Sequence, residues 1–208
     1  MLGIYGGSFD PVHLGHLATA SEAGQLTGCD RVLMVPAAIS PGKEAPRVCA
    51  DERLEMLRIA VAEWPGLDIE PCELHRAGPS FTVDTLRLLR QRESQPLLLI
   101  IGADAFLGLE KWRHWRELFQ LAHLFVAARP DVDWRLSPNL AAEYERRRVG
   151  EPAELAGADQ GLIMHRALRQ YPLSSTRIRQ QLSLGHPVEG VPEKVLAYIR
   201  KQRLYRDR

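Results

Sequence analysis

The stretch Leu2-Gly-Ile-Tyr-Gly-Gly-Ser-Phe-Asp-Pro-Val-His-Leu-Gly-His16 decides the fold of this chain. The apolar run at its start predicts a strand over residues 2–5, which ends at a pair of glycines. Asp10 followed by Pro11 is the pattern of a helix start, and we expect a helix over residues 11–26. Open α/β sheets bind ligands beyond the carboxyl ends of their strands, so this junction is a predicted ligand site.

The same alternation of short apolar runs and amphipathic segments continues along the chain. Further strands are predicted over residues 31–35, 67–69, 97–101, 124–128 and 161–164. Further helices are predicted over residues 51–64, 81–92 and 112–121, and a surface helix within 130–160, where Ser137 and Pro138 mark a helix start. Strict alternation of strand and helix implies βαβ units, and therefore an α/β fold with a doubly wound parallel sheet and helices on both faces.

Length and composition favour one globular domain with a small extension. The chain has 208 residues, of which 45% are hydrophobic and 25% are charged, and this is enough to build one core. We expect that core over residues 1–168 and a C-terminal helical extension over residues 169–208, packed on the same domain. Basic residues near the end are interpreted as a solvated helix end; they are Arg200, Lys201, Arg203, Arg206 and Arg208.

The charge balance and the cysteines exclude several classes of protein. A formal net charge of +1 favours neither a nucleic-acid nor a membrane partner, so any site for a polyanion must be local. Cys29, Cys49 and Cys72 form an odd, widely spaced set, which argues against a disulfide framework and favours the reduced cytoplasm. The longest wholly aliphatic run, residues 97–101, is too short to cross a bilayer.

The residues after the first strand are suited to binding an anion. Gly6 and Gly7 allow backbone N–H groups to approach a phosphate, and the helix behind them offers N–H donors and a partial positive charge. That charge is only about half an elementary charge, so a triphosphate needs further cationic groups. His13 and His16 share one helix face and can both point at one phosphate chain, while Gly15 leaves room for a nucleobase or ribose.

The same junction excludes two common classes of nucleotide-binding protein. It contains no G-x-G-x-x-G, which disfavours a hydride-transferring dehydrogenase, and it contains no G-x-x-x-x-G-K-[ST] P-loop. The H-x-G-H spacing differs from the H-E-x-x-H spacing of a zinc site. Both histidines are therefore interpreted as phosphate ligands, and no protein metal ligand is expected.

The junction resembles that of the HxGH nucleotidyltransferase superfamily and, within it, of the bacterial nicotinate mononucleotide adenylyltransferases. The family's GGTFDPxHxGH is matched with Ser8 in place of threonine, so the hydroxyl is kept. The resemblance covers nearly the whole chain and implies a Rossmann-like fold. It also implies transfer of AMP from ATP to nicotinate mononucleotide, which gives nicotinate adenine dinucleotide (deamido-NAD) and pyrophosphate in NAD biosynthesis.

A second motif concerns the pyridine-nucleotide site. The segment Glu73–Leu86 is similar to the family's segment that borders this site, which implies that Thr82 and Thr85 help to hold the pyridine nucleotide. Phe81 stands where tyrosine is more usual, so a hydrogen bond from that phenol is lost. The resemblance further implies that Trp112 stacks on the pyridine ring or walls it.

Lys43 is the residue that the resemblance places against the acceptor phosphate. It follows Ser40-Pro-Gly, whereas the family commonly reads PPHK here, so the local loop is altered. An ordinary surface lysine is the alternative. The implied substrate-binding residues are Lys43, Thr82, Thr85 and Trp112.

Motifs in the second half of the chain complete the implied ATP site. Gly102 and Asp104, in a stretch similar to the family's IGxD, are implied to line the adenosine ribose. The segment Ser174–Arg179 matches the family's SSTxIR, and its hydroxyl and guanidinium groups at a helix start form a second anion site. An ordinary capped helix is the alternative. The implied ATP-binding residues are Gly6, Gly7, Ser8, Phe9, His16, Gly102, Asp104, Ser174, Ser175, Thr176 and Arg179.

The implied reaction is attack by the 5′-phosphate of the mononucleotide on the α-phosphorus of ATP, with pyrophosphate leaving in line. The attacking phosphate is already ionised at neutral pH, so catalysis reduces to positioning and charge stabilisation. The implied catalytic residues are His13, His16 and Arg179: His16 and Arg179 stabilise the phosphates and His13 orients them. Mg²⁺ is expected to accompany ATP.

Several alternatives stay open at this stage. The acceptor is nicotinate mononucleotide or nicotinamide mononucleotide, and other members of the superfamily use phosphopantetheine or form cytidylyl products. A nucleotide-sensing module without turnover is a more remote alternative. The chain is expected to act as a monomer or a homodimer.

Overall fold

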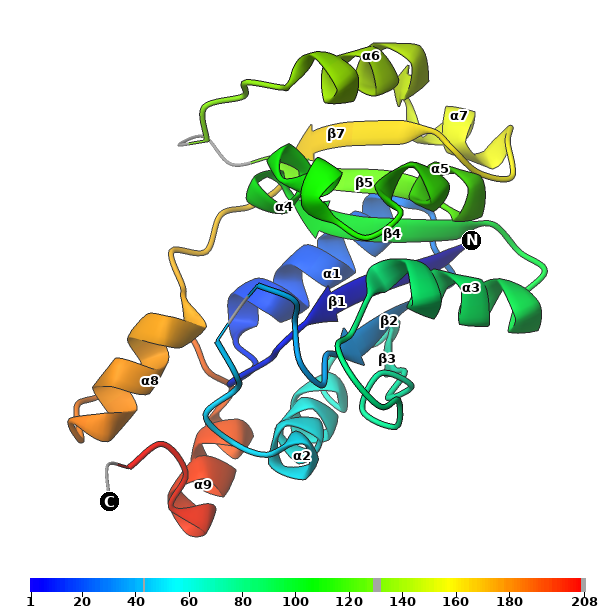
Figure 1. The fold of residues 1–208 in the computed structure, drawn as a ribbon. Helices are drawn as coiled ribbons and strands as arrows, with labels where there is room; N and C mark the ends of the chain where they lie inside the picture. The colour runs from blue at the N-terminus through cyan, green and yellow to red at the C-terminus, as the bar shows by residue number, and fades with distance from the viewer. Residues whose placement is uncertain (43, 129–131, 207–208) are drawn as a thin grey trace.

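A parallel sheet organises the part of the chain that this computed structural model describes, which is residues 1–42, 44–128 and 132–206. Within these residues the strands lie in the order β3-β2-β1-β4-β5-β7-β6, and every neighbouring pair is parallel (Figure 1). The strands are β1 (Leu2–Gly7), β2 (Arg31–Pro36), β3 (Leu67–Ile69), β4 (Leu97–Gly102), β5 (His123–Ala128), β6 (Arg148–Val149) and β7 (Ile163–Ala167). The predicted doubly wound parallel sheet is confirmed.

Alternate strand residues divide the core into two clusters, one on each face of the sheet. In β4, Leu98 and Ile100 belong to the first cluster, whereas Leu97 and Leu99 belong to the second. Buried residues of the first cluster come from α1 (Leu14–Thr27), α2 (Ala50–Val61), α7 (Pro152–Ala156), α8 (Ser175–Ser183) and α9 (Glu193–Gln202). Those of the second come from α3 (Thr82–Arg92), α4 (Ala103–Leu107), α5 (Leu118–Leu121) and α6 (Pro138–Arg147). Helices on both faces are therefore confirmed.

The sheet order reverses at β1, and this reversal sets the position of the site. From β1 the chain builds β2 and β3 on one side and the later strands on the other (Figure 1). Ligands of open α/β sheets bind at such a reversal. Two glycines bring α1 close to this part of the sheet, because a Cβ on Gly3 or Gly24 would lie 2.7 or 2.6 Å from Val32 Cγ2.

The predicted start of the first helix was wrong. α1 begins at Leu14, with His13 as the N-cap, and Asp10 does not cap it. The Asp10 carboxylate instead accepts hydrogen bonds from the Arg47 amide and the Tyr205 hydroxyl, each at 2.8 Å. These donors are far away in the sequence, so a local capping pattern could not reveal them. By contrast, Ser137 caps α6 as predicted.

Other differences from the prediction lie between β4 and β7. The helix expected over 112–121 is replaced by a 3₁₀ turn (Trp115–Glu117) and the short α5, because His114 has a left-handed backbone with φ of 52°. α4, β6 and α7 were not predicted, and neither was a 3₁₀ turn over Leu109–Lys111. β7 begins two residues later than predicted, after Gly161 with φ of 87°.

The last helices are part of the first core cluster. Ile178 of α8 and Val195 of α9 are buried together with Val12, next to the first helix. The division after residue 168 stays a prediction. The basic residues interpreted as a solvated helix end are exposed where the structure describes them, at Arg200, Lys201, Arg203 and Arg206, and Arg208 lies outside the described residues. Tyr205, between them, packs against this cluster. Among the helices of the described residues, none is long and apolar enough to span a membrane.

Candidate active site

The two histidines of the first motif form a stacked pair at the start of α1. Their ring centroids lie 3.6 Å apart with an angle of 20° between the rings, and His13 is only 6% exposed. The backbone N–H of His13 donates to His16 Nδ1 at 3.3 Å. Because Nδ1 accepts this hydrogen bond, the proton of a neutral His16 ring lies on Nε2. His16 is therefore set up as a donor through Nε2.

Phe9 packs against one member of this pair, His16. Its ring meets His16 edge to face, with centroids 5.2 Å apart, and it is 1% exposed. The implied contact of Phe9 with ATP stays a prediction. Because the Phe9 ring is buried, only the backbone of Phe9 could make this contact. The ring itself fixes the position of His16.

A cleft of about 270 Å³ opens beside the histidines, over the carboxyl ends of β1, β4 and β5. The residues lining it include Tyr5, His13, His16, Gly102, Ser174 and Ser175. Three motifs that are far apart in the sequence thus meet at one edge of the sheet. Asp104 follows Gly102 in the first turn of α4 and is exposed.

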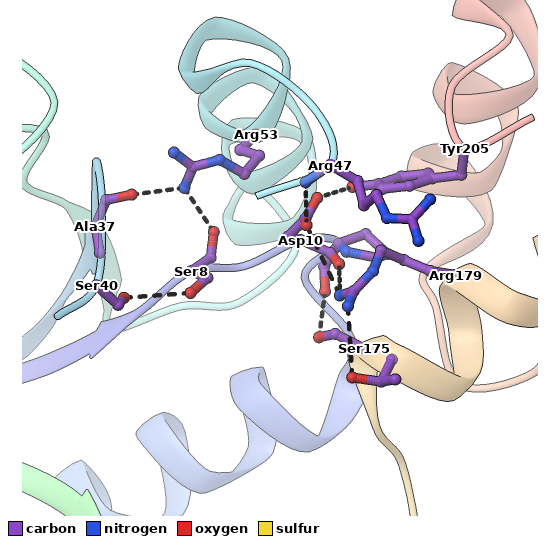
Figure 2. Close-up of polar contacts among 11 residues, drawn as sticks. Ser8, Asp10, Ala37, Ser40, Arg47, Arg53, Ser175, Arg179 and Tyr205 are labelled. Carbon is purple, nitrogen blue, oxygen red and sulfur yellow. Dashed lines mark hydrogen bonds and ion pairs between the residues drawn. The ribbon is translucent and has the colours of Figure 1, made fainter. Parts of the chain in front are cut away.

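The start of α8 is bound to the loop between β1 and α1. Ser175 Oγ donates to the Pro11 carbonyl at 3.0 Å, and Arg179 Nη1 donates to the Asp10 carbonyl at 2.8 Å (Figure 2). Arg179 Nη2 also donates to Thr176 Oγ1 at 3.4 Å. The two predicted anion sites therefore face each other across a short loop.

The start of α1 offers fewer donors than the sequence indicated. The Leu14 N–H donates to the Gly190 carbonyl at 2.8 Å, and the His16 N–H donates to the His13 carbonyl at 2.9 Å. Amides of a first helical turn are available to a ligand only where no protein carbonyl accepts from them. Side chains must therefore supply more of the phosphate binding at this helix than predicted.

A buried arginine that the sequence analysis missed holds the loop in place. Arg53 on α2 is 1% exposed and donates through Nη1 to the carbonyls of Ser8 and Ala37, each at 2.7 Å (Figure 2). Burial lowers the pKa of its guanidinium, and the nearby charge of Asp10 opposes this. The arginine thereby fixes the loop after β1 against the loop after β2. One feature of the sequence indicates this burial: the spacing of Arg53 from Met56 and Leu57 places it on the apolar face of α2.

The predicted acceptor side lies around the start of α3. Thr85 is 2% exposed, and its hydroxyl donates to Glu73 Oε1 at 2.6 Å, so it supports the segment before α3 from beneath. Burial raises the pKa of Glu73, and hydrogen bonds from Thr85 and Ser80 oppose this shift. Thr82 is the first residue of α3 and is half-buried, and Lys43 lies outside the described residues.

Aromatic and cationic side chains gather at the same place. Phe81 and Trp112 are half-buried against the second core cluster. The Arg113 guanidinium carbon lies 4.8 Å from the centre of the Phe81 ring. An ion pair between Arg87 on α3 and Glu117, with 2.6 Å between Nη2 and Oε2, holds the segment after Trp112 against α3. This region therefore combines flat apolar walls with a positive charge.

Comparison with known proteins identifies the family. A model of a family described as cytidylyltransferase-like matches residues 4–181. A protein of Halorhodospira halophila named "probable nicotinate-nucleotide adenylyltransferase" is 43% identical over 196 residues, which cover 93% of this chain and 90% of that protein. A protein of the same name from Methylococcus capsulatus is 40% identical over 208 residues, which cover 99% of each. The chain belongs to the nicotinate-nucleotide adenylyltransferases.

The fold is also that of a solved nicotinate-nucleotide adenylyltransferase. The structure of Plasmodium falciparum nicotinic acid mononucleotide adenylyltransferase complexed with NaAD matches with a TM-score of 0.73 and 16% identity, covering 98% of this chain and 96% of that one. At this identity the likeness shows the fold alone. The family and the fold that the sequence predicted are thus confirmed, whereas the individual site residues remain predictions.

Proposed function

We propose that this chain transfers AMP from ATP to nicotinate mononucleotide, forming nicotinate adenine dinucleotide and releasing pyrophosphate. One observation carries the proposal. The stacked pair His13 and His16 and the first two residues of the Ser174–Arg179 motif, Ser174 and Ser175, line the same cleft at the point where the sheet order reverses. This is the arrangement that a triphosphate between two cationic walls requires.

The chain's own residues act in this reaction by positioning and charge. His16 donates from Nε2 to the phosphates, while His13 keeps its ring in place by stacking and by the bond to Nδ1. Arg179 and Thr176, which share a hydrogen bond on α8, are proposed to stabilise the charge that grows on the leaving pyrophosphate. The acceptor phosphate is itself the nucleophile, so no protein nucleophile is needed.

The residues of the cleft fit Mg²⁺ that arrives bound to ATP. Within the described part of the chain, no group of three or more His, Cys, Asp or Glu side chains could hold a metal ion. Mg²⁺ usually keeps several waters and binds substrate phosphates with few protein carboxylates. When bound, it would neutralise part of the triphosphate charge.

The side of the site over β2 and α3 is proposed to hold the pyridine. The cleft for ATP lies over β1, β4 and β5, so the space over β2 and α3 is left for the acceptor. The half-buried rings of Phe81 and Trp112 suit a flat pyridine, and the Arg113 guanidinium suits the carboxylate of nicotinate better than the amide of nicotinamide. These contacts support nicotinate mononucleotide as the acceptor.

The compartment proposed for this reaction is the cytoplasm. Cys29, Cys49 and Cys72 are all free thiols, which a reducing compartment maintains. The chain is proposed to act as a monomer or a homodimer.

The function is tested by measuring pyrophosphate release from ATP and Mg²⁺ with nicotinate mononucleotide, nicotinamide mononucleotide or phosphopantetheine as acceptor. The masses of the products are measured by mass spectrometry. We expect fast release with nicotinate mononucleotide and a product with the mass of nicotinate adenine dinucleotide. Turnover of another acceptor alone would refute the proposed substrate. Binding of ATP without turnover of any acceptor would refute the proposed activity in favour of a nucleotide sensor.

A further inference from the structure

The segment after α9 turns back towards the loop between β1 and α1. Arg203 and Tyr205 have left-handed backbones, with φ of 55° and 61°, and the Leu204 N–H donates to the Ile199 carbonyl at 3.0 Å. This turn brings the Tyr205 hydroxyl to Asp10 Oδ1, to which it donates at 2.8 Å (Figure 2). Residues at the two ends of the described chain thus meet beside the phosphate site.

The Asp10 carboxylate is buried between three parts of the chain. It is 4% exposed, and Oδ2 accepts from the Arg47 N–H at 2.8 Å while Oδ1 accepts from Tyr205. Arg179 Nη1 lies 3.7 Å from Oδ2 but donates to the main-chain carbonyl of Asp10 at 2.8 Å. An arginine and a carboxylate usually form two short parallel hydrogen bonds. Here the Asp10 carboxylate faces the Arg47 N–H and the Tyr205 hydroxyl, and its ion pair with Arg179 keeps a long N···O distance of 3.7 Å.

We propose that Tyr205 is a positioning residue, which holds the Asp10 carboxylate away from Arg179 and so keeps the guanidinium available for the phosphates of ATP. The inference rests on the role proposed above for Arg179. Burial and the negative charge of Asp10 raise the pKa of the Tyr205 hydroxyl, so it remains a neutral donor to this carboxylate at the pH of an assay.

Removal of the Tyr205 hydroxyl leaves Oδ1 of a buried carboxylate without this donor. The nearest cation of the network is Arg179, so the carboxylate gains by rotating onto the guanidinium. Arg179 would then be paired within the protein rather than with ATP. For Tyr205→Phe we expect about a tenfold weaker affinity for ATP and for pyrophosphate, the size of effect typical of one charge-assisted hydrogen bond.

Tyr198→Phe is a matched control. The Tyr198 hydroxyl also donates to a carboxylate, Glu52 Oε2 at 2.6 Å, and it also comes from the α9 region. Glu52 lies on α2, and this bond does not involve Asp10 or Arg179. Both variants lose one tyrosine–carboxylate bond, but the bond of Tyr198 to the half-buried Glu52 lies away from Asp10, so its loss reports the effect of such a change on α9 alone. The proposal predicts that only Tyr205→Phe weakens ATP binding.

Asp10→Asn tests the same idea with Tyr205 in place. An asparagine can accept from the Arg47 N–H through its oxygen and donate through its amide to the Tyr205 oxygen, so the local contacts are kept while the charge is removed. We therefore expect Asp10→Asn to retain ATP affinity within about threefold. When the two changes are combined, we also expect Asp10→Asn to restore the ATP affinity that Tyr205→Phe loses. No carboxylate is then left at residue 10 to form an ion pair with Arg179.

The experiment is calorimetric titration of ATP with Mg²⁺, and of pyrophosphate, into the four variants and the parent chain in the absence of an acceptor. Thermal unfolding of each variant checks that it is folded. Equal affinities of the two tyrosine variants, or no restoration in the double variant, would overturn the proposal. If Tyr205→Phe is not folded, the Asp10→Asn variant decides. A large loss of ATP affinity in Asp10→Asn overturns the proposal, and an ATP affinity that is retained supports the proposal. Failure of the proposed acceptor would appear separately, as ATP binding without turnover of nicotinate mononucleotide.

Discussion

Arg113→Gln should change which pyridine mononucleotide the chain prefers. The Arg113 guanidinium is held over the Phe81 ring, beside the proposed position of the pyridine. Glutamine keeps a polar side chain of similar reach but removes the charge. Only nicotinate mononucleotide carries a carboxylate on its ring, so we expect the variant to lose kcat/KM for this acceptor and to keep it for nicotinamide mononucleotide.

The magnitude follows from the exposure of Arg113. Two unit charges about 5 Å apart attract by roughly 1 kcal/mol in water and roughly 3 kcal/mol at an effective dielectric constant of about 20. Arg113 is exposed, which favours the lower part of this range. About 1.4 kcal/mol corresponds to a tenfold change, so the ratio of the two kcat/KM values should fall by about tenfold.

Arg116→Gln is the matched control for this measurement. Its guanidinium carbon lies 4.4 Å from the centre of the Trp115 ring, so it has the same cation–π environment on a different aromatic residue. We expect this variant to leave the ratio unchanged. An equal loss for both acceptors in Arg113→Gln, or an equal change in Arg116→Gln, would refute a specific contact between Arg113 and the carboxylate.

Further predictions concern catalysis, stability and pH. His16→Ala should lower kcat by about a hundred- to a thousandfold in the pyrophosphate assay while the chain stays folded, because it removes one preorganised donor. Arg53→Met should lower the free energy of unfolding in urea by about 3–5 kcal/mol, since two carbonyls lose a buried charged donor; a loss below about 1 kcal/mol would contradict its role. Gly24→Ala should cost about 1–3 kcal/mol in the same assay, because the new Cβ would lie 2.6 Å from Val32 Cγ2. Burial lowers the pKa of His123 from 6.5, so the unfolded chain binds the proton first and stability should fall as the pH drops below about 6.5, by at most about 1.4 kcal/mol per pH unit. Urea titrations at several pH values should show a flatter dependence for His123→Gln.

Much of the fold could be predicted because its signals are local. Strands buried on both faces appear as short apolar runs, and the run at 97–101 became β4 almost residue for residue. Predictions failed where a distant partner or a backbone angle decided the outcome. Asp10 carries a capping side chain, but donors far along the chain use its carboxylate. The left-handed His114 ends the helical pattern around it, and nothing in the residue type requires this.

Residues that line the cleft could be predicted from the sequence, whereas the residues that support them could not. His13, His16, Gly102 and Ser174 were each expected to contact ATP, and all four line the cleft. The buried position of Arg53 was not predicted, because an arginine in an amphipathic helix usually lies on the solvated face. Its burial under the loop depends on where α2 packs, which sequence spacing alone does not specify.

The hydrogen bond between Tyr205 and the Asp10 carboxylate has a consequence for the order in which activity appears during synthesis. The carboxylate belongs to the loop between β1 and α1, yet Tyr205, one of its donors, lies 195 residues further along the chain. A nascent chain that has already built the sheet would still lack the turn after α9, and its phosphate loop would lack one of its restraints. Full ATP affinity would therefore arise late, once the segment after α9 folds back onto the loop between β1 and α1.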